Sequence, residues 1–282
     1  MEQLLPFAGF TTLFLVVIGL SFMFMFWVEA LFPLVSVQDK HQIKHVSSNF
    51  GLWVIAFVFA DMVVGIALLN LPDHLYQIPF GLFYWLPLNS SVLLIFIGVL
   101  VVDLFSYLYH RLLHKLPWLW RIHAVHHSDT ELDVSTTIRT HPAELLLGNL
   151  WLTAACILLG IPIWVNALHE IIFIPLILLQ HSNTRVSEKL DKILRPVFVS
   201  PFVHKHHHSI IREQHDSNYG IGLLIWDRLL NTYQVPCSQI PQVVGVSGMQ
   251  DAKWQSITGM LLAPFRYKPQ RVLEPSAAPG KI

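Results

Sequence analysis

The sequence has little charge and almost no cysteine. Only 13% of its 282 residues are charged, against roughly 25% in an ordinary soluble protein. Basic and acidic residues number 18 each, so no net charge remains to attract nucleic acid, and no nucleic-acid partner is expected. Two cysteines, Cys156 and Cys237, cannot form a disulfide framework or a cysteine-rich zinc site. Hydrophobic residues reach 54%, which excludes intrinsic disorder and argues against an ordinary soluble domain.

Five long apolar runs account for this composition, and each is predicted to be a membrane helix. They cover about residues 7–32, 50–71, 92–109, 145–159 and 164–179. Gly160 and Pro162 predict a tight turn between the last two runs. Those two runs are slightly short for a perpendicular span, so this hairpin can either cross the bilayer or enter it and return. The sequence therefore predicts an all-α multipass membrane protein with about four to five apolar helices and a cytoplasmic helical cap.

Lysine and arginine are unevenly distributed between the runs. Segment 33–49 carries Lys40 and Lys44, segments 110–140 and 181–200 carry four basic residues each, and segment 72–91 carries none. Because positively charged loops stay in the cytoplasm, we expect an outside N-terminus and a cytoplasmic C-terminal third. Three regions follow: transmembrane helices in 1–109, a histidine-rich region in 110–235 that includes the hairpin at about 145–180, and a cytoplasmic segment and tail in 236–282.

Histidine is abundant, with 16 residues, and eight of them fall into three groups with helical spacing. The groups are His110 and His114, then His123, His126 and His127, and last His204, His207 and His208. Residues three or four apart share one face of a helix, so each group presents two or three imidazoles in one direction. His181 ends the fifth apolar run at the same membrane depth. Eight or nine imidazoles suit two metal ions with four to five nitrogens each.

The remaining histidines have simpler interpretations. A lone histidine near a membrane end is usually solvated or hydrogen-bonded, and we interpret His41, His45 and His74 in this way. For His169, the sequence leaves open both that interpretation and a functional role.

Acidic residues near the histidines are candidates for orienting them. Asp103 lies seven residues before His110, on the same helical face, and a carboxylate in an apolar run needs a partner. We therefore expect Asp103 to accept the second N–H of a metal-binding histidine. Glu144 and Asp227 are candidates of the same kind. We interpret Trp118, Trp120 and Trp226, in contrast, as an interfacial aromatic belt.

The ordered histidine motifs resemble those of the fatty acid hydroxylase/sterol desaturase superfamily of membrane oxygenases, over about residues 95–235. The matching pieces are His110-Arg-Leu-Leu-His114, Leu119-Trp-Arg-Ile-His123-Ala-Val-His126-His127-Ser128, Arg139-Thr-His141-Pro-Ala-Glu144, Gln180-His181-Ser-Asn183, Ser200-Pro-Phe-Val-His204-Lys-His-His207-His208-Ser209, and Asp216-Ser-Asn218-Tyr219-Gly220 leading to Trp226-Asp227.

The resemblance implies two iron ions, for which zinc can substitute in a structure, and dioxygen as co-substrate. It implies hydroxylation or desaturation of a lipid C–H bond in a fatty acyl chain, a sphingoid base or a sterol. Electrons would come from a separate haem or iron–sulfur carrier with its reductase. The implied ligands are His110, His114, His123, His126, His127, His181, His204, His207 and His208. His206 occupies a variable position, while His141 and His215 stay open as ligands.

The resemblance also implies an enzyme of the bacterial inner membrane or the endoplasmic reticulum, with its active site on the cytoplasmic side. Two other functions stay open on the residues alone. A zinc-dependent membrane hydrolase would use Glu144 as its general base, although no zinc-protease signature is present. A metal transporter would place its ligands near the middle of the spans, whereas here they lie at span ends.

Overall fold

The computed structural model describes residues 5–35, 39–69, 81–85, 91–236 and 243–268. Within these residues the regular structure is helical, with a few isolated β-bridges. The helices are α1 (Leu5–Leu31), α2 (Asp39–Leu69), α3 (Leu82–Trp85), α4 (Ser91–Lys115), α5 (Pro117–His127), η2 (Val134–Ile138), α6 (Pro142–Leu159), α7 (Trp164–His181), α8 (Glu188–Leu194), α9 (Pro201–His207), α10 (Arg212–His215), α11 (Ile225–Leu229), η3 (Ala252–Gln255) and α12 (Ile257–Arg266).

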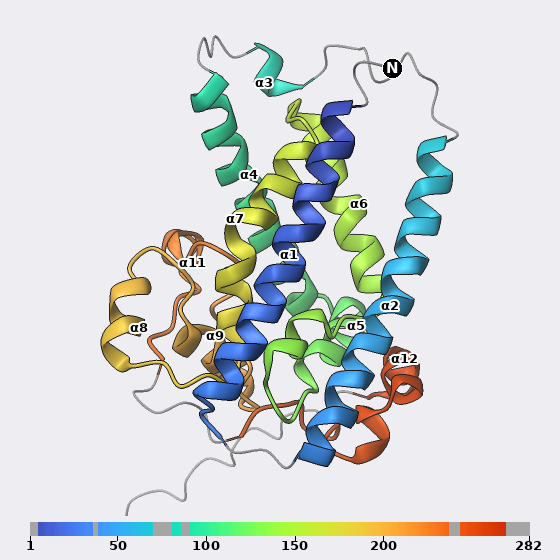
Figure 1. Ribbon diagram of the computed structural model, residues 1–282, viewed down its shortest axis with the longest axis vertical. Helices are drawn as coiled ribbons and strands as arrows, with labels where there is room; N and C mark the ends of the chain where they lie inside the picture. The colour runs from blue at the N-terminus through green and yellow to red at the C-terminus, as the bar shows by residue number, and fades with distance from the viewer. Residues whose placement is uncertain (1–4, 36–38, 70–80, 86–90, 237–242, 269–282) are drawn as a thin grey trace, which may run out of the picture.

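Five of these helices are long and apolar enough to cross a membrane, which confirms the predicted all-α fold. The candidate spans are Thr12–Leu31, His41–Val63, Val92–Lys115, Pro142–Leu159 and Trp164–His181. Figure 1 shows α1, α2, α4, α6 and α7 standing side by side, with the chain running alternately down and up. The predicted turn is present, because Gly160 ends α6 in the left-handed conformation at φ 75°. The short helices that follow α4 gather at the lower end of the bundle in this view, whereas α3 lies at the upper end.

Helix α4 packs against two other spans. It packs on both α6 and α7, while α2 packs on α6 and α1 packs on α7. Val102 of α4, Cys156 of α6 and Val165 of α7 share one buried apolar cluster. The helix that carries the first two histidines is therefore held on two sides by apolar packing.

Two helices extend beyond the apolar runs that predicted them. Helix α2 begins at Asp39, whereas its apolar run begins at about residue 50, and α4 continues to Lys115. The added turns are polar because they reach the histidine-bearing end, where His45 and Asn49 enter a hydrogen-bond network. Hydropathy locates the part of a helix that contacts lipid and does not register such polar turns.

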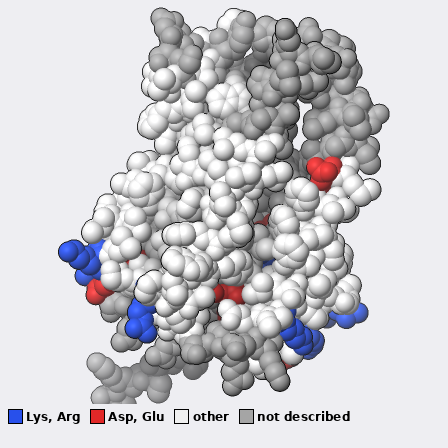
Figure 2. All heavy atoms as spheres, in the orientation of Figure 1, with Lys and Arg blue, Asp and Glu red and all other residues white. Residues whose placement is uncertain are grey.

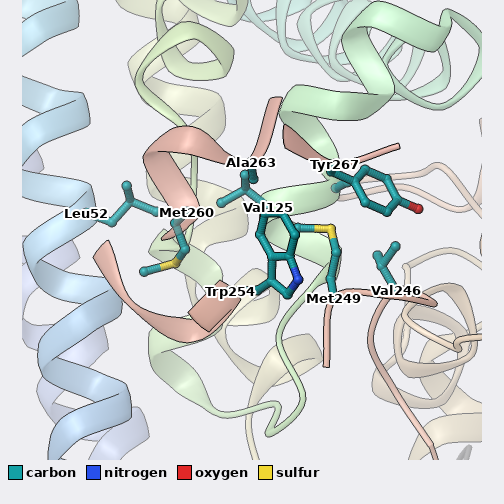
Figure 3. Close-up of a cluster of buried hydrophobic side chains, with 9 residues drawn as sticks. Leu52, Val125, Val246, Met249, Trp254, Met260, Ala263 and Tyr267 are labelled. Atoms are coloured by element: carbon teal, nitrogen blue, oxygen red, sulfur yellow. The ribbon is translucent and has the colours of Figure 1, made fainter. Parts of the chain in front are cut away.

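Helix α5 lies across the lower end of the bundle and is held there by a buried apolar cluster. Figure 3 shows Val125 of α5 packed among Leu52 of α2, Trp254 and Met260, and Met260 is fully buried. Residues of an α-helix advance by about 100° each, so Val125 lies on the side of α5 opposite His123 and His127. The cluster therefore fixes one face of α5 and leaves the histidine face pointing toward the bundle.

Charged side chains follow the same division between the two ends. Figure 2 shows Lys and Arg only on the lower half of the visible face, around the short helices. The upper half of that face, where the spans continue, shows almost no charge among the described residues. The apolar half is the part of the molecule suited to hydrocarbon, and the charged half is suited to a membrane surface.

Candidate metal centre

The nine predicted ligands lie together at the lower end of the bundle, in two groups. In each group the candidate ligand atoms lie within 4.8 Å of one another. The five-histidine group is His110, His114, His123, His127 and His207, and the four-histidine group is His126, His181, His204 and His208. All nine residues are buried. The structure thus brings together residues that are up to about a hundred positions apart in the sequence.

Four helices supply these rings, and local sequence explains how they meet. His110 and His114 end α4, and Pro117 starts α5 directly afterwards, with Leu116 extended at φ −95° and ψ 118°. A residue before proline avoids the helical region, so the chain turns between α4 and α5. The turn directs His123 back toward α4. Helix α7 ends on His181, and α9 with its C-cap residue supplies the last three ligands.

In the five-histidine group, ring nitrogens face each other with no proton between them. His110 donates from Nδ1 to the carbonyl of Tyr219 at 2.8 Å, and His123 donates from Nδ1 to Glu144 Oε1 at 2.8 Å. Their Nε2 atoms therefore carry lone pairs in the neutral rings, yet these atoms lie only 3.1 Å apart. His207 has the same arrangement, with Nδ1 donating to the Ser217 carbonyl at 2.6 Å and Nε2 3.2 Å from His110 Nε2.

The four-histidine group repeats this geometry. His126 donates from Nδ1 to the Arg139 carbonyl at 3.2 Å, and His181 donates from Nδ1 to the Ile177 carbonyl at 2.9 Å. Their Nε2 atoms are 3.3 Å apart, and His181 Nε2 is 2.8 Å from His204 Nε2. Converging lone pairs at such distances repel one another unless a cation lies among them. Both groups therefore fit a metal ion bound through Nε2.

Burial keeps several of these imidazoles neutral. It lowers the pKa of His126, His127 and His207 well below the usual range, and the positive charge that a protonated neighbouring histidine would carry lowers it further. Only a neutral imidazole has the lone pair that binds a metal. Both nitrogens of His127 are buried without any hydrogen-bond partner, which is costly unless an ion binds one of them.

Glu144 and Asp103, the two predicted orienting residues, have different surroundings. Glu144 accepts the Nδ1 proton of His123 and so contacts a candidate ligand directly. Asp103 instead accepts hydrogen bonds from His169 Nε2 at 2.8 Å and Trp226 Nε1 at 2.7 Å. It also accepts from the backbone amides of Gly222 and Leu223. Asp103 therefore holds the 222–226 segment against α4 and α7, and a direct role on a ligand stays a prediction.

Asp227 acts on the backbone next to a candidate ligand. Its carboxylate accepts from the amides of Tyr219 and Gly220 at 2.8 and 2.7 Å, and from Thr232 Oγ1 at 2.6 Å. The Tyr219 carbonyl in turn receives the His110 proton. The proposed aromatic belt does not include Trp226, because its indole N–H is bound to Asp103. A buried carboxylate offers this N–H a stronger acceptor than an interface does.

The histidines left open or set aside fall outside both groups. His141 caps α6: its Nδ1 accepts from the Ala143 amide at 3.1 Å, and its Nε2 donates to the Leu261 carbonyl at 3.3 Å. His215 donates to the Ser209 carbonyl and stacks on Trp120 at 5.0 Å between ring centroids. His206 faces Gln234. His41 is exposed, and His74 lies outside the described residues.

Sequence reasoning missed residues that hold this end together. The sequence predicts a solvated or hydrogen-bonded His45 without indicating its partners, and the structure shows it bonded to two aspartates, Asp129 and Asp133. Arg139 was only part of a motif, yet its side chain is fully buried and its carbonyl orients His126. The sequence does contain one signal of this network. His45 and Asn49 lie four residues apart, and polar residues at that spacing indicate a polar helix face.

Comparisons with known proteins give the following similarities. Residues 95–232 match the family described as fatty acid hydroxylase. The chain is 31% identical over 203 residues to an ornithine lipid hydroxylase of Rhizobium tropici, covering 70% of this chain and 58% of that protein. It is 30% identical over 133 residues to the alkylglycerol monooxygenase of Homo sapiens, covering 47% of this chain and 29% of that protein. No solved structure matches.

Proposed function

Since the chain belongs to the fatty acid hydroxylase family, we propose that it is a membrane lipid hydroxylase that binds two iron ions, one in each histidine group. The chain spans 58% of the length of its bacterial relative and 29% of the human one, so the activity is inferred from the part they share and from the site. The observation that carries the proposal is the convergence of nine buried imidazoles into groups of five and four.

Two ions of iron, when bound, supply the redox chemistry by which dioxygen attacks an unactivated C–H bond, which zinc alone does not supply. The chain's own residues hold and orient the ligands. The carbonyls of Tyr219 and Arg139 and the carboxylate of Glu144 fix Nδ1 as the protonated nitrogen of His110, His126 and His123. Each Nε2 is thereby kept free for metal. Burial of all nine rings excludes water that would otherwise compete for the ions.

The position of the site supports a lipid substrate. The groups lie where α4 and α7 end, so an alkyl or acyl chain lying along the spans can present a C–H bond to them while its headgroup stays at the membrane surface. The named relatives are a hydroxylase of ornithine lipid and monooxygenases of alkylglycerol, which favours hydroxylation over desaturation and a polar lipid over a free hydrocarbon.

Electrons for the reaction come, in this proposal, from a separate haem or iron–sulfur protein with its reductase. The histidine-bearing end faces the cytoplasm, because the basic segments 33–49, 110–140 and 181–200 adjoin that end. The membrane is then the bacterial inner membrane or the endoplasmic reticulum.

Two features speak against the other functions. A hydrolase would need Glu144 beside the metal as a general base, but Glu144 contacts the Nδ1 side of His123, away from the converging nitrogens. A transporter would need ligands within the spans and a route between them, whereas both groups lie at one end of the bundle.

Variants of two candidate ligands and of one histidine outside both groups test the proposal. We expect His126→Ala and His207→Ala to abolish formation of a hydroxylated lipid, measured by mass spectrometry of lipids from expressing cells. His206→Ala should retain most of the activity, because His206 lies between ligands on α9 but faces Gln234. Turnover should require dioxygen and an added electron donor. An undiminished rate without dioxygen would contradict the proposal, and so would equal damage from His206→Ala and His207→Ala.

Metal analysis is the companion measurement. The purified protein should hold about two ions per chain, as a shell of four to five nitrogens for each ion implies. One ion or none in a folded preparation would contradict the two-ion centre.

A further inference from the structure

A buried charged cluster lies beside the metal centre, between the start of α2 and the segment after α5. His45 Nε2 lies 2.8 Å from Asp129 Oδ1, and His45 Nδ1 lies 3.1 Å from Asp133 Oδ2. The side chains are 11%, 0% and 7% exposed for His45, Asp129 and Asp133. Both ring nitrogens therefore face carboxylate oxygens in a place that water barely reaches.

This geometry requires a positive charge on His45. An ionised carboxylate only accepts hydrogen bonds, so each ring nitrogen must donate, and a histidine with two donors is an imidazolium. Arg139, which is fully buried, supplies the second positive charge of the cluster. The two cations balance Asp129 and Asp133. Loss of either cation would leave a buried negative charge without compensation.

Asn49 connects the aspartate side of the cluster to Arg139. Its amide nitrogen donates to Asp129 Oδ2 at 3.3 Å and to Ser135 Oγ at 2.9 Å. Its amide oxygen accepts from Arg139 at 2.9 Å. Asn49 lies one helical turn after His45, so both contacts are made from one face of α2. A membrane-spanning helix thus holds the buried arginine.

Arg139 in turn makes hydrogen bonds to the end of α5 and to one of its histidines. Its Nε donates to the Val125 carbonyl at 2.8 Å, and one terminal nitrogen donates to Ser128 Oγ at 2.9 Å. A guanidinium at the C-terminal end of a helix also complements the helix dipole. The backbone carbonyl of the same residue accepts the Nδ1 proton of His126 at 3.2 Å. His126 belongs to the four-histidine group.

We propose that His45 is a positioning residue for the ion of the four-histidine group. Its positive charge is balanced by Asp129 and Asp133. The contacts that this cluster makes through Asn49 and Arg139 hold His126 in place. This inference rests on the proposed two-ion centre. It adds that metal binding by the four-histidine group depends on His45, whereas metal binding by the five-histidine group does not. The five-histidine group shares α5 through His123 and His127, but Arg139 does not bond either of their rings, and His123 is oriented by Glu144 instead.

The test is titration of metal-free protein with Co²⁺, whose visible absorption reports the ligands of each ion. Wild-type protein should bind two equivalents. His181→Ala removes a ligand of the four-histidine group and identifies the spectral component of that group. In His45→Gln the same component should bind at least about tenfold more weakly, the usual cost of losing an orienting partner, while the other component stays within about twofold.

Charge rescue separates positioning from simple support of the fold. His45→Lys restores a cation, and His45→Gln with Asp133→Asn restores a neutral cluster, so both should recover most of the lost affinity. Glu144→Ala is the matched control and should weaken the other component. Equal weakening of both components in His45→Gln, or no recovery in either rescue variant, would overturn the inference. Wild-type protein that binds fewer than two ions would instead reject the centre itself, whereas two ions with an unchanged His45→Gln titration would reject this inference alone.

Discussion

Main-chain carbonyls orient most of the histidine rings whose outer nitrogen has a partner. The carbonyls of Tyr219, Ser217, Arg139 and Ile177 each accept an Nδ1 proton from a candidate ligand. A carbonyl is present in every residue, so a sequence cannot show which ones serve this purpose. Glu144 could be predicted because its carboxylate is a recognisable acceptor, and the structure places it on His123. At the residue scale, the sequence therefore predicted which histidines come together, but not most of the groups that orient them.

Substitutions at Glu144 measure how much an acceptor for the Nδ1 proton contributes to metal affinity. Glu144→Ala removes the acceptor of the His123 proton, and we expect metal affinity to fall by about ten- to a hundredfold. Glu144→Gln keeps an oxygen that can accept the same proton, so it should lose less. Metal content after dialysis against a weak chelator measures both variants. Equal losses would show that the charge, rather than the hydrogen bond, is what His123 requires.

The lowered histidine pKa values predict how the metal-free protein responds to acid. Burial, chiefly, lowers the pKa of His127, His204 and His207 in the folded state, while the unfolded chain keeps values near the usual 6.5. Below about pH 6.5 the unfolded chain then binds more protons than the folded one, so stability falls as pH falls. The thermal unfolding midpoint of chelator-treated protein should be lower at pH 5.5 than at pH 7.5. Equal midpoints would contradict burial of neutral rings.

At the scale of helices, apolar runs located the spans but not their functional ends. Asp103 shows why: its spacing from His110 was consistent with the same helix face, but its partners come from α7 and from the 222–226 segment. Spacing along one helix cannot indicate which distant segment packs there. The same limit applies to α2, whose first polar turns carry His45 and Asn49 into contacts more than 80 residues away.

Helix α12 provides a test of how α5 is held. Met260 is fully buried in the cluster beneath α5, whereas Phe265 on the same helix is 80% exposed. Met260→Ala should lower the free energy of unfolding by about 2–5 kcal/mol, the cost of such a cavity. Phe265→Ala should change it little. Denaturant unfolding in detergent compares the two, and equal effects would mean that the cluster does not support α5.

For the whole molecule, alternation of the five spans places both histidine groups, the start of α2 and the end of α7 at one end. Segment 81–85 lies at the other end. In a background with Cys156 and Cys237 replaced by serine, Ile43→Cys and Lys192→Cys should react with a membrane-impermeant thiol reagent only from the cytoplasmic side. Leu82→Cys should react only from the opposite side. Labelling of Ile43→Cys and Leu82→Cys from one side would reject this topology.

The cluster in Figure 3 also bears on the order of events during synthesis. The ninth candidate ligand, His208, leaves the ribosome well before Trp254 and Met260, which pack beneath α5, and before Gln255, whose oxygen binds Arg139 at 2.9 Å. A nascent chain therefore contains all nine candidate ligands before it contains the C-terminal residues that hold α5 in place. We expect loading of the metal to be a late event, which follows release of the chain and is not completed while the spans are being inserted.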